Sequence, residues 1–180
     1  MKKALKIIGI LFLIIICFRG FFYRSFICYK EIGTRTEIMI TNPQLIHKIE
    51  AQSANYTIDA KTITSIANNI TKETLYFSGR QAFRDPNVLI DKHKANCVGY
   101  STMFNSIANY LIRKHHLERQ IEARHLIGQL NFMGINLHQF FHTPFFKDHD
   151  FNEITNLKTG KSISIDPSVS DYLYINRVSH

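Results

Sequence analysis

The sequence has no tryptophan, only four prolines and only three cysteines among its 180 residues. Three cysteines are too few for a secreted scaffold framed by several disulfides, and four prolines with eight glycines exclude collagen-like and low-complexity tracts. Acidic residues are absent from the first 30 positions. Because 45% of the residues are apolar, the chain is too hydrophobic for a disordered protein. The composition therefore indicates one globular domain.

The basic character of the chain is concentrated at its N-terminus. Residues 1–30 hold six basic residues and no acidic one, whereas residues 31–180 hold 16 basic and 14 acidic residues. A nucleic-acid-binding domain needs a basic face on its folded part. The aromatic residues are also not interleaved with Lys and Arg, as they are in a single-strand-binding groove. We therefore expect no nucleic-acid partner.

The first 30 residues are typical of a targeting or anchoring segment. Basic residues precede the apolar run Ile7–Phe18, and bulky residues occupy positions 18–29, where a cleavage site would need small ones. A span from Leu5 to Tyr23 approaches the roughly 20 residues that a bilayer requires. We predict an uncleaved signal anchor over residues 1–30 with the domain on the extracytoplasmic side, periplasmic or extracellular. A cleaved, secreted form is the alternative.

Hydrophobic periodicity after residue 58 predicts two helices followed by short strands. Asp59 is a suitable N-cap for a helix that reaches about Tyr76, and the strongest helical pattern runs from Cys97 to about His115. Strands are expected at residues 120–130, 133–141, 152–156 and 162–165, a loop at 78–87 and a turn at Gly160. The order predicts an α+β fold with residues 59–180 as the domain and residues 31–58 as a linker and N-terminal extension.

Cys97 is the only cysteine after residue 28, so it has no partner for a disulfide within the domain. It begins the strongest predicted helix, and a helix N-terminus lowers the pKa of a thiol. A reactive thiolate and an ordinary buried cysteine are, from position alone, equally good interpretations.

Motifs at and after Cys97 resemble the core of the transglutaminase-like superfamily. They are CVGYS at residues 97–101, IEAR at 121–124 with Gly128, HDFNEI at 149–154, and DPS at 166–168 after Gly160. Their order suits the family, as do the separations of 52 residues from Cys97 to His149 and 17 residues from His149 to Asp166. The resemblance covers roughly residues 60–175.

The resemblance implies a papain-like core, with the nucleophile helix packed on an antiparallel sheet, and a triad for acyl chemistry. Cys97 would attack an amide carbon, His149 would act as general base and acid, and Asp166 would orient the imidazole. No cofactor and no metal are implied.

The residues around this triad depart from the family pattern in part. Phe151 stands where the family has Trp, and Ala95 stands where it often has Gly. Asn96 is a candidate side-chain donor for an oxyanion site. Glu153 shares its strand face with Phe151 and would support the site.

Histidines and acidic residues between positions 125 and 150 permit a different interpretation. The potential metal ligands are His125, His138, His142, Asp148, His149 and Asp150. Residues 133–141 are predicted as strand or loop, however, and no HExxH motif is present. Asp148 and Asp150 are expected at a solvated strand end, because the neighbours of His149 point to the opposite face.

These observations predict a membrane-anchored, transglutaminase-like cysteine enzyme that acts on amide bonds of a protein or peptide substrate. A domain of about 120 residues leaves little structure to exclude water, so hydrolysis by a peptidase or amidase is favoured over acyl transfer. The alternatives are a non-catalytic transglutaminase-like binding or scaffolding module at the membrane, and a His-rich metal-binding protein.

Overall fold

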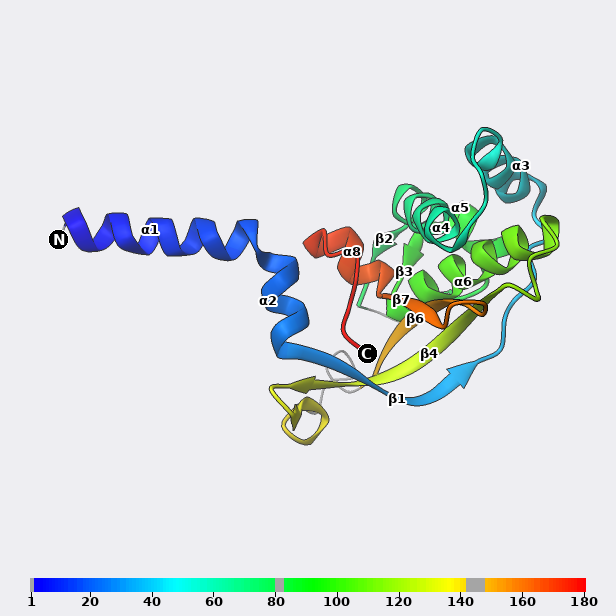
Figure 1. Cartoon of the computed structure of the whole chain (residues 1–180). Helices are drawn as coiled ribbons and strands as arrows, with labels where there is room; N and C mark the ends of the chain where they lie inside the picture. Colours follow the sequence, from blue (N-terminus) through cyan, green and yellow to red (C-terminus); the bar gives the residue numbers. More distant parts are fainter. Residues whose placement is uncertain (1, 80–82, 142–147) are drawn as a thin grey trace.

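The chain forms a mixed α/β fold built on one antiparallel sheet (Figure 1). It is seen in a computed structural model that describes residues 2–79, 83–141 and 148–180. The elements in chain order are α1 (Lys2–Cys17), α2 (Arg19–Phe26), β1 (Ile27–Arg35), α3 (Pro43–Ser53), α4 (Ala60–Thr74), β2 (Tyr76–Phe77), α5 (Pro86–Lys92), β3 (Lys94–Ala95), α6 (Cys97–Lys114), β4 (Ile121–Phe132), β5 (Ile135–Asn136), a 3-10 turn (Leu137–Gln139), β6 (Asp148–Asn156), β7 (Lys161–Ile165) and α8 (Pro167–Leu173).

The main sheet has the strand order β1-β4-β6-β7, and each neighbouring pair is antiparallel. β5 pairs only with the end of β4, and β2 and β3 form a separate parallel pair. In the central pair, His149 of β6 lies opposite Gly128 of β4, and Asp150 lies opposite Ile127. β7 pairs with β6 only from Asn152 onward, so among the described residues His149 and Asp150 pair with β4 alone.

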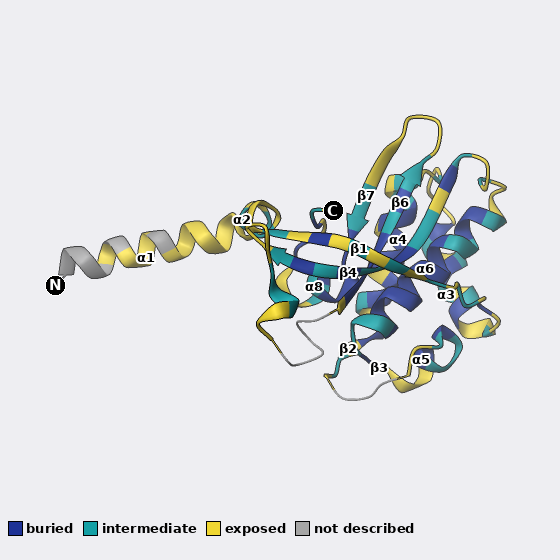
Figure 2. Ribbon diagram, turned by 90° about the horizontal axis from the view of Figure 1, so that it is seen from below, coloured by how far each residue is buried: buried dark blue, intermediate teal, exposed yellow. Residues whose placement is uncertain are grey.

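Apolar side chains cover both faces of the sheet. Helices α4 and α6 supply most of the larger cluster on one face, which continues into the sheet through Ile121, Ile154 and Ile165. A smaller cluster on the other face contains Tyr29, Leu126, Leu130, Phe151 and Val178. Figure 2 shows the result as a buried centre where β4, β6 and α6 meet. Helix α6 is thus the central helix of the fold, and the residue that begins it is held against the sheet.

Both predicted helices are present, and local capping explains where they begin. The Asp59 carboxylate accepts a hydrogen bond from the backbone N–H of Thr62 at 2.7 Å, so α4 begins directly after it. Helix α6 begins at Cys97 and ends at Lys114, as the periodicity predicts. The turn at Gly160 also forms, with φ of +67°.

The prediction of a strand over residues 133–141 is wrong. Met133 and Gly134 adopt positive φ values of 50° and 85°, which turn the chain back on the end of β4. Only two residues then pair as β5 before a 3-10 turn begins at Leu137. The predicted loop at 78–87 ends earlier than expected, because Asp85 caps α5 and Pro86 occupies its first turn; residues 80–82 lie outside the described residues.

The segment before residue 59 contributes more to the fold than a linker does. The predicted boundary at residue 30 falls inside β1, which pairs with β4 over its whole length. Residues 43–53 form α3, and the Asn42 side chain caps it by accepting hydrogen bonds from Gln44 and Leu45. The N-terminal half of the chain therefore supplies an outer strand of the sheet.

The predicted continuous membrane span is interrupted at Phe18. Among the described residues no single helix is long and apolar enough to cross a bilayer; only the pair Ile8–Cys17 and Arg19–Phe26, bent by 78°, meets that requirement in length and composition. Figure 1 shows α1 extending away from the sheet, and apolar side chains such as Ile8 and Phe12 are more than 60% exposed on it.

Candidate active site

Cys97 occupies the first position of α6, where local packing fixes the backbone closely. The Asn96 side chain caps the helix by accepting a hydrogen bond from the N–H of Gly99 at 3.2 Å. A Cβ atom on Gly99 would lie 2.8 Å from both the carbonyl oxygen of Phe83 and the Cβ of Ala95. Only glycine permits this approach, so the entry of the chain into α6 is tightly determined.

The thiol of Cys97 lies against the backbone of β6. Burial raises its pKa to about 11, and hydrogen bonding to the backbone of Asp150 and of Val98 opposes that rise only in part. The thiol is therefore protonated at neutral pH in this structure. The contact with the Asp150 backbone places the thiol next to the peptide group that joins His149 and Asp150.

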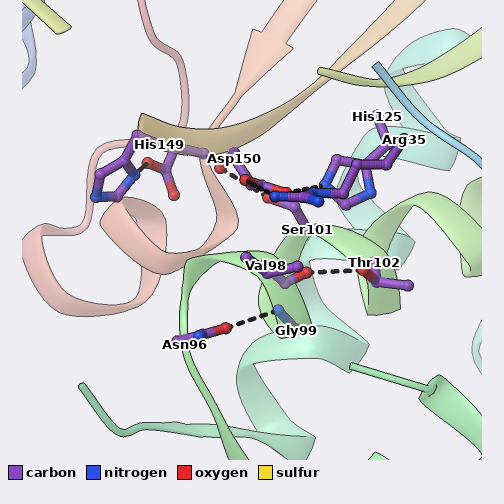
Figure 3. A network of polar contacts seen from close by, with 10 residues as sticks. Arg35, Asn96, Val98, Gly99, Ser101, Thr102, His125, His149 and Asp150 are labelled. Carbon is purple, nitrogen blue, oxygen red and sulfur yellow. Dashed lines mark hydrogen bonds and ion pairs between the residues drawn. The ribbon is translucent and has the colours of Figure 1, made fainter. Parts of the chain in front are cut away.

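A second contact fixes the same strand to the same helix. The hydroxyl of Ser101, one turn after Cys97, donates a hydrogen bond of 2.8 Å to the carbonyl oxygen of Asp150. Figure 3 shows Ser101 below Asp150, and shows His149 and Asp150 on opposite sides of the strand above the first turn of α6. The helix and the strand thus keep a defined register at the site.

His149 and Asp166 form a buried pair. The imidazole Nδ1 lies 2.7 Å from Oδ2 of Asp166, and the two side chains are only 4% and 0% exposed. Burial alone would lower the pKa of His149, but the charge of Asp166, the hydrogen bond to it and the charge of Asp150 together raise the pKa above its usual value. Burial alone would raise the pKa of Asp166, but His149 holds it below its usual value. Each partner thus stabilises the charged form of the other.

Asp166 is held by its own helix and by two tyrosines. Its Oδ1 caps α8 by accepting hydrogen bonds from the N–H groups of Ser168 and Val169, at 3.0 and 3.1 Å, and from the Ser168 hydroxyl at 2.6 Å. The Tyr29 hydroxyl donates to Oδ2 at 3.0 Å and lies 2.7 Å from the hydroxyl of Tyr23. A chain of hydroxyl groups therefore runs from α2 to the carboxylate that faces His149.

Asp150 is not at a solvated strand end, so that prediction is wrong. It is 1% exposed, and its carboxylate accepts hydrogen bonds from the guanidinium of Arg35 and lies 2.7 Å from Nε2 of His125 (Figure 3). Burial favours a raised pKa for Asp150, but these two partners hold it below its usual value. Asp150 does lie on the opposite face of the strand from His149, but α6 packs on that face and the Arg35 side chain reaches it from the end of β1. Asp148, the other flanking acid, is exposed.

The remaining predicted site residues have structural contacts of their own. The side-chain amide oxygen of Asn96 (Oδ1) caps α6 by accepting from the N–H of Gly99. Phe151 is fully buried and packs on Tyr29, with ring centroids 5.1 Å apart. Glu153 lies four residues from His149 along β6 and pairs with Arg124 and His180, so it is not brought to the His149–Asp166 pair.

The predicted metal ligands do not gather at one point. In the described parts of the chain, no group of three or more His, Cys, Asp or Glu side chains could hold a metal ion. His125 and Asp150 lie together, His149 faces Asp166, and His138 pairs with Asp148 at 3.5 Å. His142 lies outside the described residues.

Five residues at the site were not predicted from the sequence. These are Tyr23, Tyr29, Arg35, His125 in its pairing with Asp150, and Ser168. Ser168 alone had a local signal, because a serine two residues after a capping aspartate is well placed to bond it. Tyr29, Arg35 and His125 reach the site through strand pairing, and Tyr23 reaches it from α2.

No family model matches this chain, and neither a curated protein nor a solved structure with significant similarity to it is found. The contacts above are therefore the basis for any statement about function.

Proposed function

We propose that this protein is a membrane-anchored, transglutaminase-like cysteine enzyme that hydrolyses amide bonds of a protein or peptide. One observation carries the proposal: His149, which is paired with buried Asp166, lies on β6, and the backbone of β6 contacts the thiol of Cys97. A nucleophile, a base and a carboxylate that orients the base are the three groups that acyl chemistry requires. The order of the three along the chain is also that of the transglutaminase-like pattern.

The division of roles follows from which nitrogen is already used. Because Nδ1 of His149 faces Asp166, we assign to Nε2 the acceptance of the proton of Cys97. The sulfur then attacks the amide carbon, and His149 passes the proton to the nitrogen as the C–N bond breaks. Water attacks the resulting thioester, gives a proton to His149 and displaces the sulfur. The carboxylic acid leaves as the product, and His149 returns its proton to the sulfur of Cys97.

Because the pKa of Cys97 is raised, His149 would act as a general base that removes the thiol proton. A protonated thiol does not attack until its proton is removed, so no resting ion pair is required. The raised pKa of His149 makes the imidazole a stronger base for this step. N–H groups at the start of α6 other than that of Gly99, which bonds the Asn96 cap, would stabilise the negative charge that develops on the carbonyl oxygen.

The membrane part of the proposal rests on the apolar surface of α1. Nothing in the described structure covers its exposed side chains, and the basic residues of α1 lie at its N-terminal end, before the apolar run. We expect the chain to stay in the membrane fraction after an alkaline wash, with the domain on the extracytoplasmic side. Release of the full-length chain by that wash would contradict the anchor.

Probe labelling of the full-length chain tests the proposed chemistry. A peptidyl acyloxymethyl ketone, whose thiol-reactive carbon sits beside a peptide carbonyl, should label wild type and Cys28→Ala at equal rates. Cys97→Ala should abolish labelling, because the exposed Cys28 lies on β1, which pairs with β4 and not with the strand that carries His149. His149→Gln should slow labelling by about 100-fold or more. Equal labelling of wild type and Cys97→Ala would refute the proposal.

A non-catalytic binding module at the membrane is the second candidate, because the raised thiol pKa also suits an inert buried cysteine. Hydrolysis of a mixed peptide library, followed by mass spectrometry, separates the two functions. Cleavage by wild type that Cys97→Ala lacks supports the enzyme. Binding of peptides without any cleavage supports the module.

A further inference from the structure

An apolar pocket lies beside the imidazole of His149. Its volume is about 270 Å³, and its described lining residues are Phe77, His149, Ser168, Val169, Tyr172 and Leu173. They come from β2, β6 and α8. No Asp, Glu, Lys or Arg is among them, and the charge of His149 is balanced by Asp166 outside the pocket.

The pocket is also adjacent to the start of α6. Phe77 pairs with Ala95, two residues before Cys97, and the ring of Phe77 lies 6.3 Å from the ring of Tyr100 in the first turn of α6. The proposed base, His149, therefore forms part of the pocket wall. Phe77, another part of the wall, pairs with the segment that leads into the proposed nucleophile. A group held here would lie next to the bond under attack.

The walls of the pocket are already fixed in this structure. The Tyr172 hydroxyl accepts a hydrogen bond of 2.8 Å from the N–H of Phe77, and the two rings meet edge to face with centroids 5.4 Å apart. The carbonyl oxygen of Leu173 accepts a hydrogen bond of 2.6 Å from Arg19 of α2. A preformed pocket loses little entropy when a ligand enters it.

We infer that this pocket binds one large apolar side chain, aromatic or branched aliphatic, of a peptide substrate, next to the amide that is hydrolysed. The inference rests on the proposed function for the position of that amide. An apolar cavity of about 150 Å³ is enough to hold benzene, so 270 Å³ accommodates a phenylalanine or leucine side chain but not a long acyl chain as a whole. A charged side chain would lose its hydration without gaining a partner.

A panel of probes tests the preference. Acetyl-X acyloxymethyl ketones with X as Phe, Leu, Ala or Glu differ only in the side chain offered to the pocket. Labelling of Cys97 in the full-length chain should be about 10- to 100-fold faster with Phe or Leu than with Ala, and slowest with Glu. Equal rates across the panel would overturn the inference while leaving the proposed function intact.

A matched pair of variants locates the preference. Leu173 and Leu157 are equally exposed, at 47% and 48%, but only Leu173 lines the pocket. Leu173→Ala should reduce the Phe-to-Ala rate ratio several-fold, because part of the apolar wall is removed. Leu157→Ala should leave the ratio unchanged. Identical ratios in the two variants would contradict the assignment of the pocket.

Binding without chemistry separates this inference from the proposed function. In Cys97→Ala, N-acetyl-phenylalaninamide should shift the methyl NMR signals of Val169 and Leu173 saturably and leave those of Leu157 in place. N-acetyl-alaninamide and the glutamate analogue should shift none of them. If no probe labels Cys97 but these shifts occur, the proposed function fails and the pocket assignment stands. Absence of the shifts overturns the assignment whatever the labelling shows.

Discussion

Replacing Asp166 with asparagine changes one oxygen of a fully buried carboxylate into an NH₂ group. Asparagine can keep one oxygen on the N–H groups of Ser168 and Val169, so the cap of α8 is retained. Its NH₂ group then faces Nδ1 of His149, which must accept instead of donate. The proton moves to Nε2, and the imidazole can no longer take the proton of Cys97.

Two magnitudes follow from this geometry. A base held in the wrong tautomer costs about 10³- to 10⁴-fold in catalysis of this kind, so labelling of Cys97 should slow by that factor. Removing one partner of a buried ion pair costs about 3–5 kcal/mol. Because His149 can lose its proton, and the cap survives, we expect the lower end, about 3 kcal/mol.

The measurements are urea unfolding of the full-length chain at about pH 6, where the imidazolium is present, and probe labelling at a pH above the pKa of His149, where the neutral imidazole can accept a proton. Asp148→Asn is the matched control, since Asp148 adjoins His149 in sequence but its side chain is 48% exposed. We expect the control to change stability by less than about 0.5 kcal/mol. Labelling of Asp166→Asn within about tenfold of wild type would refute the assigned role of the carboxylate.

Three other measurements examine the surroundings of the site. Gly99→Ala should lower the free energy of unfolding by about 1–3 kcal/mol, because its Cβ would lie 2.8 Å from the carbonyl oxygen of Phe83; an unchanged melting temperature would contradict that close approach. His125→Leu removes a partner of buried Asp150 and should cost about 2–3 kcal/mol in urea unfolding, whereas His125→Gln keeps a donor and should cost less; equal losses would argue against the hydrogen bond. The folded pKa of His149 is raised above its usual 6.5, so its contribution to stability is complete below that value and is lost as the pH rises through the folded pKa. Urea unfolding from about pH 5 to about pH 9 should therefore show a fall in wild type that His149→Gln lacks, and parallel curves would count against the pair.

Local sequence determined the elements that begin and end within a few residues of their signals. Asp59 precedes α4 as the predicted cap, and Gly160 turns the chain between β6 and β7. Asn96, predicted as an oxyanion donor, is the cap of α6. The strand over 133–141 was predicted wrongly because alternating apolar residues describe a pleated surface, whereas Met133 and Gly134 turn the chain before it can pair. The periodicity of apolar residues indicates which face of a helix or strand is buried, but not which other element packs against it or pairs with it.

The membrane segment shows the same division. Apolar length and flanking charge indicate an anchor, but the bend of 78° after Cys17 and the hydrogen bond from Arg19 to Leu173 depend on the domain against which α2 packs.

The amino-acid sequence by itself determined the order of Cys97, His149 and Asp166 and the helix that begins at the cysteine. Only the tertiary structure decided what surrounds the two carboxylates. Tyr29 lies 137 residues from Asp166, and Arg35 lies 115 residues from Asp150. Such contacts form because β1 and β6 pair with opposite sides of β4, so that side chains from β1 reach across β4 to the two carboxylates; a pairing between distant strands leaves no periodic signal in either segment. The capping bonds of Asp166, by contrast, close within three residues, so they can be read from the chain directly.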